Sequence, residues 1–273
     1  MAVTMAEIQH LRKMTGAGMM DCKNALNEAN GDFDKAMEII RKKGQAVAAK
    51  REDREASEGC VLAATAGDFA AVVALQCETD FVAKNEEFIA LTQQILDAAI
   101  SHKPGTLEQL LALELPNGTV SQLITDKIGA TGEKMQLGFY EHLTAPYVTS
   151  YIHMGNKLAT IAGFNKANVD EHVAKDVAMQ VAAMNPIAVT PESIPADVKE
   201  KELEIAREKA REAGKPENLL DRIAEGALQK FYKESTLLQQ EYVKDPKKTI
   251  EQFLKENDKE LTVTSFKRVS LNV

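Results

Sequence analysis

The chain has 273 residues, 44% of them hydrophobic and 27% charged, which is ordinary for a globular protein and enough for more than one domain. Its formal net charge of −8 argues against nucleic-acid binding as the main role, because proteins with that role usually carry a basic face. Three scattered cysteines, no signal-like N-terminus and no run of about 20 apolar residues predict a soluble cytoplasmic protein without disulfides or a membrane span.

Residues 1–54 are predicted to form a three-helix domain with its linker. A T-x-x-E capping box opens the first helix, and the turn T-G-A-G ends it. A second helix is expected over about 20–29. Asp32 is a natural N-cap for a third amphipathic helix, which Gly44 is expected to close. The charged residues 45–58 have no sustained apolar face, so they are interpreted as a partly helical linker.

A hairpin followed by a helix is predicted twice in the next part of the chain. In 55–145, two β-prone runs flank the turn 66–68, a helix covers about 84–101, and an extended stretch closes the unit. In 146–196, two strands flank a Gly-Asn turn and Asp170 caps another helix. The recurrence predicts two related α+β subdomains packed into one core.

Residues 197–234 are rich in Ala, Glu, Lys and Leu and predict an antiparallel helical hairpin broken at 213–216. Each arm of about 16 residues spans about 24 Å and should project from the core. Residues 235–273 are expected to hold a short helix over 246–256 and a last strand that rejoins the second subdomain. The predicted fold class is therefore α+β and multidomain.

No catalytic motif is found in the sequence. There is no P-loop, dinucleotide fingerprint, HExxH or GxSxG pattern, and the five histidines have no metal-ligand spacing. The glycines at 16 and 18 are interpreted as an inter-helix turn rather than a phosphate-binding loop. Cys60 and Cys77 lie on predicted strands and are interpreted as buried thiols. We expect no catalytic residue, no cofactor and no metal.

Two apolar pairs and one histidine remain as candidates for contact with another molecule. If Met20 faces the small core, Met19 must point elsewhere, but both could be core residues. Phe81 and Val82 stand where a strand gives way to a helix, and the pattern leaves open whether they pack inward as a hydrophobic staple or face outward. His153 is expected on the surface, at a hairpin tip.

Three long stretches resemble bacterial elongation factor Ts. LRKMTGAGMMDCKNALNEANGDFDKAMEIIRKKG is similar to the N-terminal signature of that family, LQCETDFVAKNEEF to its second signature, and SYIHMGNKLATIAGF to its later hairpin. The resemblance covers nearly the whole chain. It implies a ubiquitin-associated-like N-terminal domain, a core of two subdomains, a projecting coiled coil and a C-terminal module.

The resemblance also implies a function. Members of the family are guanine-nucleotide exchange factors for the GTPase elongation factor Tu, so neither an active site of the chain's own nor direct nucleic-acid or membrane binding is expected. Contacts to the G domain of the partner are implied for Leu11, Met19, Met20 and Lys23. The segment that would insert near the switch region and disturb the Mg²⁺ site is Thr79, Asp80, Phe81 and Val82. His153 would support contacts from the second subdomain, and the coiled coil would add a peripheral one.

One departure from the family pattern concerns the C-terminus. Family members often continue past the last strand with a helix that touches the G domain, whereas this chain stops at Val273. A weaker or differently distributed interface is therefore expected. Two other kinds of function stay open from the residues alone. One is a passive or chaperone-like interaction module that binds a partner without altering nucleotide release, and the other is an enzyme with an unrecognised site.

Overall fold

The computed structural model describes residues 3–271 and begins with three helices that pack on one another, α1 (Met5–Thr15), α2 (Met19–Glu28) and α3 (Phe33–Lys50). The predicted capping box is present, since Thr4 and Glu7 exchange side-chain and backbone hydrogen bonds at the start of α1. Asp32 caps α3 as predicted. The helices enclose a small apolar core of Ile8, Leu11, Ala17, Cys22, Ala25, Leu26, Ala29 and Ala36.

The prediction that Gly44 ends the third helix is wrong. Helix α3 continues to Lys50, so the first part of the expected linker is helical. Gly44 lies instead where α3 crosses α7 (Val120–Thr131), opposite Gly129. A Cβ atom placed on Gly129 would stand 2.6 Å from the Cα of Gly44. The glycine is there to allow close approach of two helices rather than to terminate one.

The first predicted hairpin and its helix are confirmed. Strands β1 (Glu58–Ala66) and β2 (Phe69–Cys77) pair in register, and β5 (Met135–Thr144) adds to β2, all antiparallel. The short helix α4 (Asp80–Ala83) and the long helix α5 (Glu86–His102) follow β2. The apolar side of α5 covers one face of this sheet, with Phe88 and Ile95 fully buried. Two shorter helices follow, α6 (Leu107–Leu111) and α7, separated by the two-residue strands β3 (Glu114–Leu115) and β4 (Gly118–Thr119).

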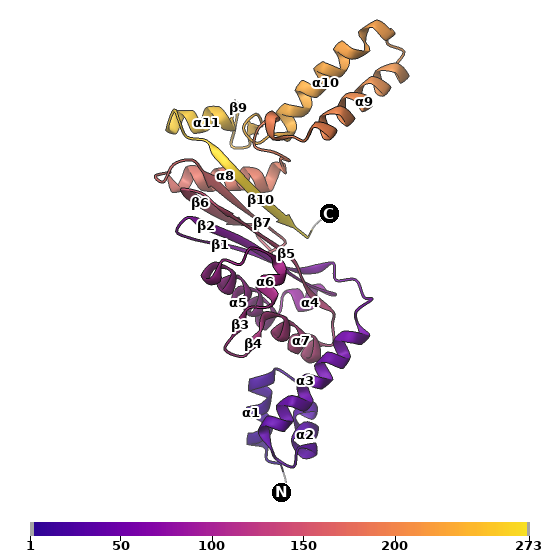
Figure 1. Cartoon of the computed structure of the whole chain (residues 1–273), viewed down its shortest axis with the longest axis vertical. Coiled ribbons are helices and arrows are strands. Elements are labelled where there is room, and N and C mark those ends of the chain that lie inside the picture. Colours follow the sequence, from indigo (N-terminus) through magenta and orange to yellow (C-terminus); the bar gives the residue numbers. More distant parts are fainter. Residues whose placement is uncertain (1–2, 272–273) are drawn as a thin grey trace.

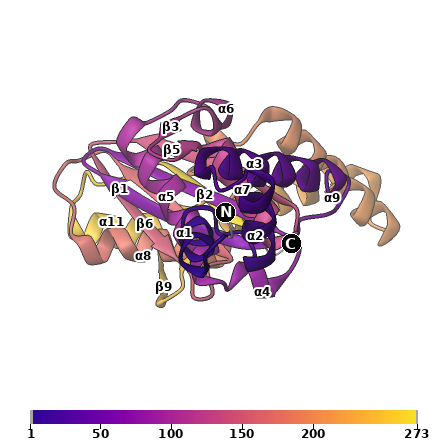
Figure 2. The same cartoon turned by 90° about the horizontal axis from the view of Figure 1, so that it is seen from below.

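The second hairpin and helix are confirmed as well. Strands β6 (Tyr147–Ile152) and β7 (Leu158–Phe164) pair, β10 (Val263–Ser270) adds to β7 as predicted, and α8 (Glu171–Met184) covers the outer face. The two sheets face each other across apolar side chains such as Val72 and Ile161. The core is thus layered as helix, sheet, sheet, helix (Figure 1), and the view from below shows α1–α3 set against its α5 and α7 side (Figure 2).

The tail differs in one detail from its prediction. Residues 246–249 belong to strand β9 (Asp245–Thr249), which pairs with β8 (Glu241–Tyr242), and the helix α11 spans Ile250–Asn257. The helix starts late because Thr249 and Gln252 form a capping box, which fixes its first turn after the proline.

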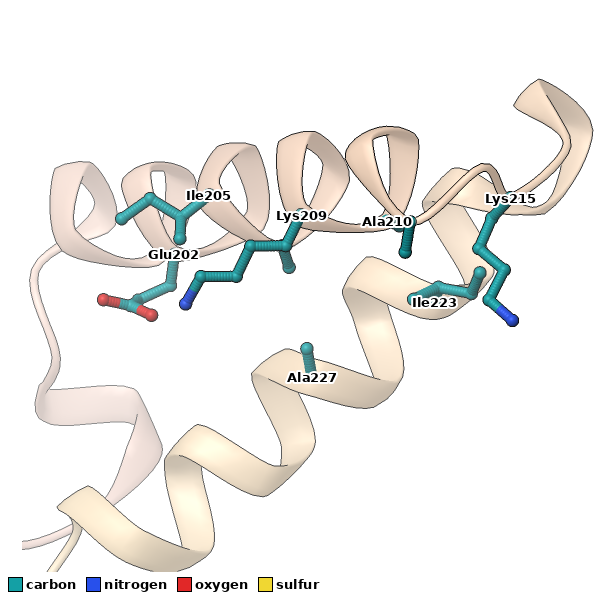
Figure 3. A pocket seen from close by; sticks show the side chains of 9 residues that line it. Glu202, Ile205, Lys209, Ala210, Lys215, Ile223 and Ala227 are labelled. Atoms are coloured by element: carbon teal, nitrogen blue, oxygen red, sulfur yellow. The ribbon is translucent and has the colours of Figure 1, made fainter.

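The helical hairpin consists of α9 (Ala196–Glu212) and α10 (Leu220–Ser235), with short 3₁₀ turns at Pro191–Ser193 and Glu217–Leu219. Figure 1 shows the hairpin projecting at the opposite end of the molecule from α1–α3. On the second arm Leu220, Ala224 and Leu228 are buried, whereas Leu219 and Ala227 are exposed. Near the tip the arms flank a hollow of about 350 Å³, into which Ala210, Ile223 and Ala227 face (Figure 3).

The architecture is α+β, as predicted. The division into domains 1–54, 55–145, 146–196 with 235–273, and 197–234 stays a prediction, as does the ubiquitin-associated-like description of the first three helices.

Candidate functional site

The junction between β2 and α5 presents an aromatic ring to solvent. Thr79 caps the four-residue helix α4, its hydroxyl accepting a hydrogen bond from the Val82 N–H at 3.4 Å. The side chain of Phe81 is 85% exposed, whereas Val82 packs against the core beneath it. The interpretation of Phe81 as an inward staple is therefore wrong, and Val82 supplies the inward contact. We call residues 79–82 the Phe81 turn.

Two carboxylates hold the Phe81 turn, that of the distant Glu133 and that of the adjacent Glu78. The N–H and the hydroxyl of Thr79 donate to the two carboxylate oxygens of Glu133, at 3.1 and 2.6 Å. Glu78 accepts hydrogen bonds from Arg51 at the end of α3, at 3.3 Å to each oxygen, and from the N–H of Lys134 at 2.7 Å. Charge-assisted bonds of this kind are stronger than neutral ones, so the turn is well fixed.

Asp80 stands beside the exposed ring and is charged at neutral pH. Its carboxylate accepts a hydrogen bond from Lys84 at 2.6 Å. That bond, together with the positive charges of Lys84 and Lys157, lowers the pKa of the Asp80 carboxyl below its ordinary value. The ion pair is accordingly complete above the ordinary carboxyl pKa and is lost as the pH falls through the lowered one.

The tip of the β6–β7 hairpin lies at the same end of the sheets as the Phe81 turn. The N–H of Val61 on β1 donates to the Asn156 carbonyl at 2.7 Å, and Lys157 forms an ion pair with Glu58, which lies opposite Cys77. His153 is exposed at this tip, as predicted, with its Nδ1 3.0 Å from the Tyr151 hydroxyl. The neighbouring Met154 is 91% exposed, a second large apolar side chain at this end.

The candidate residues of the N-terminal helices fall into two groups. Met20 is 63% exposed, and Lys23, one helical turn later, is exposed beside it. Met19 is only partly exposed and packs against the core of α1–α3, so of the two methionines it is Met19 that faces inward and Met20 that faces outward. Leu11 is fully buried in that core. A side chain without exposed surface cannot contact a partner directly, so we assign Leu11 to packing.

Some residues that shape this site were not singled out by the sequence patterns. Glu133 and Arg51 lie far from the Phe81 turn in the chain, Glu78 directly precedes it, and charged residues are common on any surface. Met154 carried a usable signal, because a large apolar side chain directly before a Gly-Asn turn is unlikely to be buried. The local sequence pattern thus singles out Phe81 but not the distant residues that support it.

Within residues 3–271 no group of three or more His, Cys, Asp or Glu side chains is placed to hold a metal ion. Among the helices of residues 3–271, none combines the length and the hydropathy that a membrane span requires. The three cysteines are buried and unpaired with one another. Burial raises the pKa of the Cys60 thiol to about 11 and that of Cys77 to about 12, which makes them poor nucleophiles.

We expect a thiol reagent at pH 8 to modify neither Cys60 nor Cys77 in the folded protein. With a pKa of about 11, about one Cys60 thiol in a thousand is ionised at that pH, and burial blocks access to it. In denaturant all three cysteines should react rapidly. Mass spectrometry after timed alkylation measures both rates, and fast native labelling of Cys60 or Cys77 would show that the sheet opens readily at β1–β2.

The chain is similar to known proteins along its whole length. The family model described as "Elongation factor TS" matches residues 78–272. A curated protein from Porphyromonas gingivalis is 66% identical over 273 residues, which covers 100% of this chain and 99% of the relative. A protein from Azobacteroides pseudotrichonymphae is 57% identical with 100% of both chains covered, and one from Bacteroides fragilis is 49% identical over an alignment of 328 positions with 99% of both covered. All three are named Elongation factor Ts. The chain therefore belongs to the elongation factor Ts family of translation elongation factors.

Proposed function

We propose that this protein is the guanine-nucleotide exchange factor of elongation factor Tu. The observation that carries the proposal is the Phe81 ring, 85% exposed on a turn that two hydrogen bonds from Thr79 to Glu133 hold in place. Three more hydrogen bonds, from Arg51 and Lys134, fix Glu78 directly before the turn. Leaving a large aromatic ring in contact with water is unfavourable compared with burying it. Rings that are nevertheless exposed on a fixed support are typical anchors of protein interfaces. Membership of the elongation factor Ts family supports the same conclusion.

The exchange needs no chemistry from this chain. A factor that binds the nucleotide-free GTPase more tightly than the GDP-bound form must weaken GDP binding by the same factor, because the binding steps are thermodynamically linked. Each 1.4 kcal/mol of such preference weakens GDP binding about tenfold. Phe81 inserted between elements of the GTPase displaces those that hold the Mg²⁺ ion and the phosphates. Asp80, kept ionised by Lys84, orients the turn against the partner.

The proposed contact surface has three parts. The Phe81 turn, with Thr79, Asp80 and Val82 around the ring, is its centre. His153 and Met154 extend it from the second sheet, and Met20 with Lys23 contact the GTPase from the N-terminal helices. The ring and the two methionines are exposed apolar side chains of the kind enriched at interfaces. We place this activity in the cytoplasm, with the GTPase as the partner and without direct contact to nucleic acid or membrane.

Release of a fluorescent GDP analogue from elongation factor Tu tests the proposal. Stopped-flow mixing with excess unlabelled GDP gives the release rate, which we expect to rise steeply and saturably with the concentration of this protein. Addition of excess Mg²⁺ should reduce the acceleration if displacement of the ion is part of the mechanism. Binding without any change in the release rate would instead identify a passive or chaperone-like interaction module.

A further inference from the structure

We propose that Glu133 is the residue that positions Phe81 for exchange. The inference rests on the proposed function, but it concerns a property of the free protein that can be measured without the partner. Glu133 lies 54 positions after Thr79 in the chain, yet both of its carboxylate oxygens accept hydrogen bonds from that one residue. No other described side chain is hydrogen-bonded to the N–H of Thr79.

The Phe81 turn cannot hold its own geometry. Helix α4 has four residues, too few for a helix to be stable by its own hydrogen bonds in water. Its cap is weak, since the Val82 N–H lies 3.4 Å from the Thr79 hydroxyl oxygen. The Thr79 hydroxyl donates a hydrogen bond to Glu133. The lone pairs of the hydroxyl oxygen then remain free to accept from the Val82 N–H. The carboxylate therefore orients the cap as well as the backbone.

The side chain of Glu133 links the segments that follow β2 and precede β5, beyond the last residue pair of their ladder. The last pair of the β2–β5 ladder is Cys77 with Met135, and beyond it the two segments no longer exchange backbone hydrogen bonds. Instead the N–H of Thr79 donates to Glu133, and the N–H of Lys134 donates to Glu78. Each segment thus offers a carboxylate to a backbone donor of the other. This reciprocal pair satisfies two groups left over at the end of the ladder and carries the rigidity of the sheet into the turn.

Glu133 is itself well placed to act as a support. It follows Gly132, the left-handed cap of α7, and its own N–H donates to the Thr131 hydroxyl at 3.3 Å. Its side chain is partly buried rather than fully exposed, and its two oxygens are engaged with Thr79. The carboxylate is directed at the turn and not outward at a partner. Glu133 is therefore a positioning residue, whereas Phe81 makes the contact.

The first measurement uses the free protein. The chain has no tryptophan, so Phe81→Trp introduces a single fluorophore on the turn. We expect Glu133→Ala to lower the time-resolved anisotropy of that tryptophan, because the ring then moves on the nanosecond timescale. Glu141→Ala is the matched control, since it removes a carboxylate of β5 that pairs with Lys267 at 2.8 Å. Unchanged anisotropy in Glu133→Ala, with the same melting temperature as its parent, overturns the proposal.

The second measurement is nucleotide release by proteins that keep Phe81. We expect Glu133→Ala to lower the exchange efficiency about tenfold, which corresponds to about 1.4 kcal/mol. Glu133→Gln retains an acceptor for the Thr79 N–H and should lose only about two- to threefold. Because Glu133 acts through Thr79, Thr79→Val should cost much less in the Glu133→Ala background than alone. Additive losses would mean that Glu133 acts by another route and would overturn the assignment.

The two measurements separate the two claims. If the parent protein does not accelerate GDP release, the proposed function fails, while the anisotropy result on Glu133 still stands or falls by itself. If the parent accelerates release and Glu133→Ala loosens the turn but exchanges as fast as the parent, the role of Glu133 in exchange is refuted. Loosening of the turn together with slower exchange, both spared in Glu141→Ala, supports the proposal.

Discussion

Replacing Phe81 by alanine is expected to lower the efficiency of nucleotide exchange about thirtyfold or more. Truncation of a central aromatic anchor typically costs an interface about 2 kcal/mol or more, and each 1.4 kcal/mol is a factor of ten. The fold should not suffer, because the ring is 85% exposed and contributes little to the core. Surface substitutions of this kind change the free energy of unfolding by about 0.5 kcal/mol or less. Stopped-flow GDP release and thermal unfolding measure the two effects.

Phe139→Ala is the matched control for this prediction. Phe139 lies on β5 and is 42% exposed, so the substitution removes the same aromatic group from another surface position. It should leave exchange within about twofold of the parent, a change of about 0.4 kcal/mol. A Phe81→Ala protein that unfolds at a much lower temperature, yet exchanges normally while folded, would contradict the assignment of Phe81 as the contact residue.

The sequence predicted most of the fold because short-range periodicity determined it. The run around Ala66, Gly67 and Asp68 has a turn flanked by β-prone residues, and the structure has a hairpin there. Asn85 and Asp170 cap long helices whose apolar spacing is evident in the sequence. In each case the residues that decide the element lie within about one helical turn or one hairpin of each other.

The support of the candidate site could not be predicted in the same way. The bonds from Thr79 to Glu133 and from Arg51 to Glu78 join residues 54 and 27 positions apart, and no local pattern marks such pairs. The wrong prediction that Gly44 ends the third helix has a related cause. Glycine at a helix end and glycine at a helix crossing look alike in one sequence, and only the partner helix distinguishes them. Burial of Leu11 likewise depends on how three helices meet.

At the crossing of α3 and α7, two similar glycine-to-alanine substitutions are expected to change the stability of the protein in different ways. Gly129→Ala is expected to destabilise the protein, whereas Gly44→Ala is expected to be neutral or stabilising. Both glycines lie inside helices, where alanine is favoured by about 0.5–1 kcal/mol. The two sites differ in the space available for a methyl group. A Cβ on Gly129 would stand 2.6 Å from the Gly44 Cα, whereas the atom nearest to a Cβ on Gly44 is the Thr125 carbonyl oxygen, at 3.4 Å. The backbone contact at Gly129 can be relieved only by moving one helix.

That movement is costly because α3 packs against α7 over an extended contact, and Val47 and Ala48 of α3 also pack against the core. Moving α3 away from α7 would loosen these contacts along with the one at Gly129. An overpacked contact typically costs about 1–3 kcal/mol, which exceeds the gain in helix propensity. Thermal unfolding of the two single variants measures the difference. Equal stability of Gly129→Ala and Gly44→Ala would show that α1–α3 are not held against the core by this crossing. If they are so held, the crossing also fixes where Met20 and Lys23 stand relative to Phe81, and Gly129→Ala should slow exchange while Gly44→Ala does not.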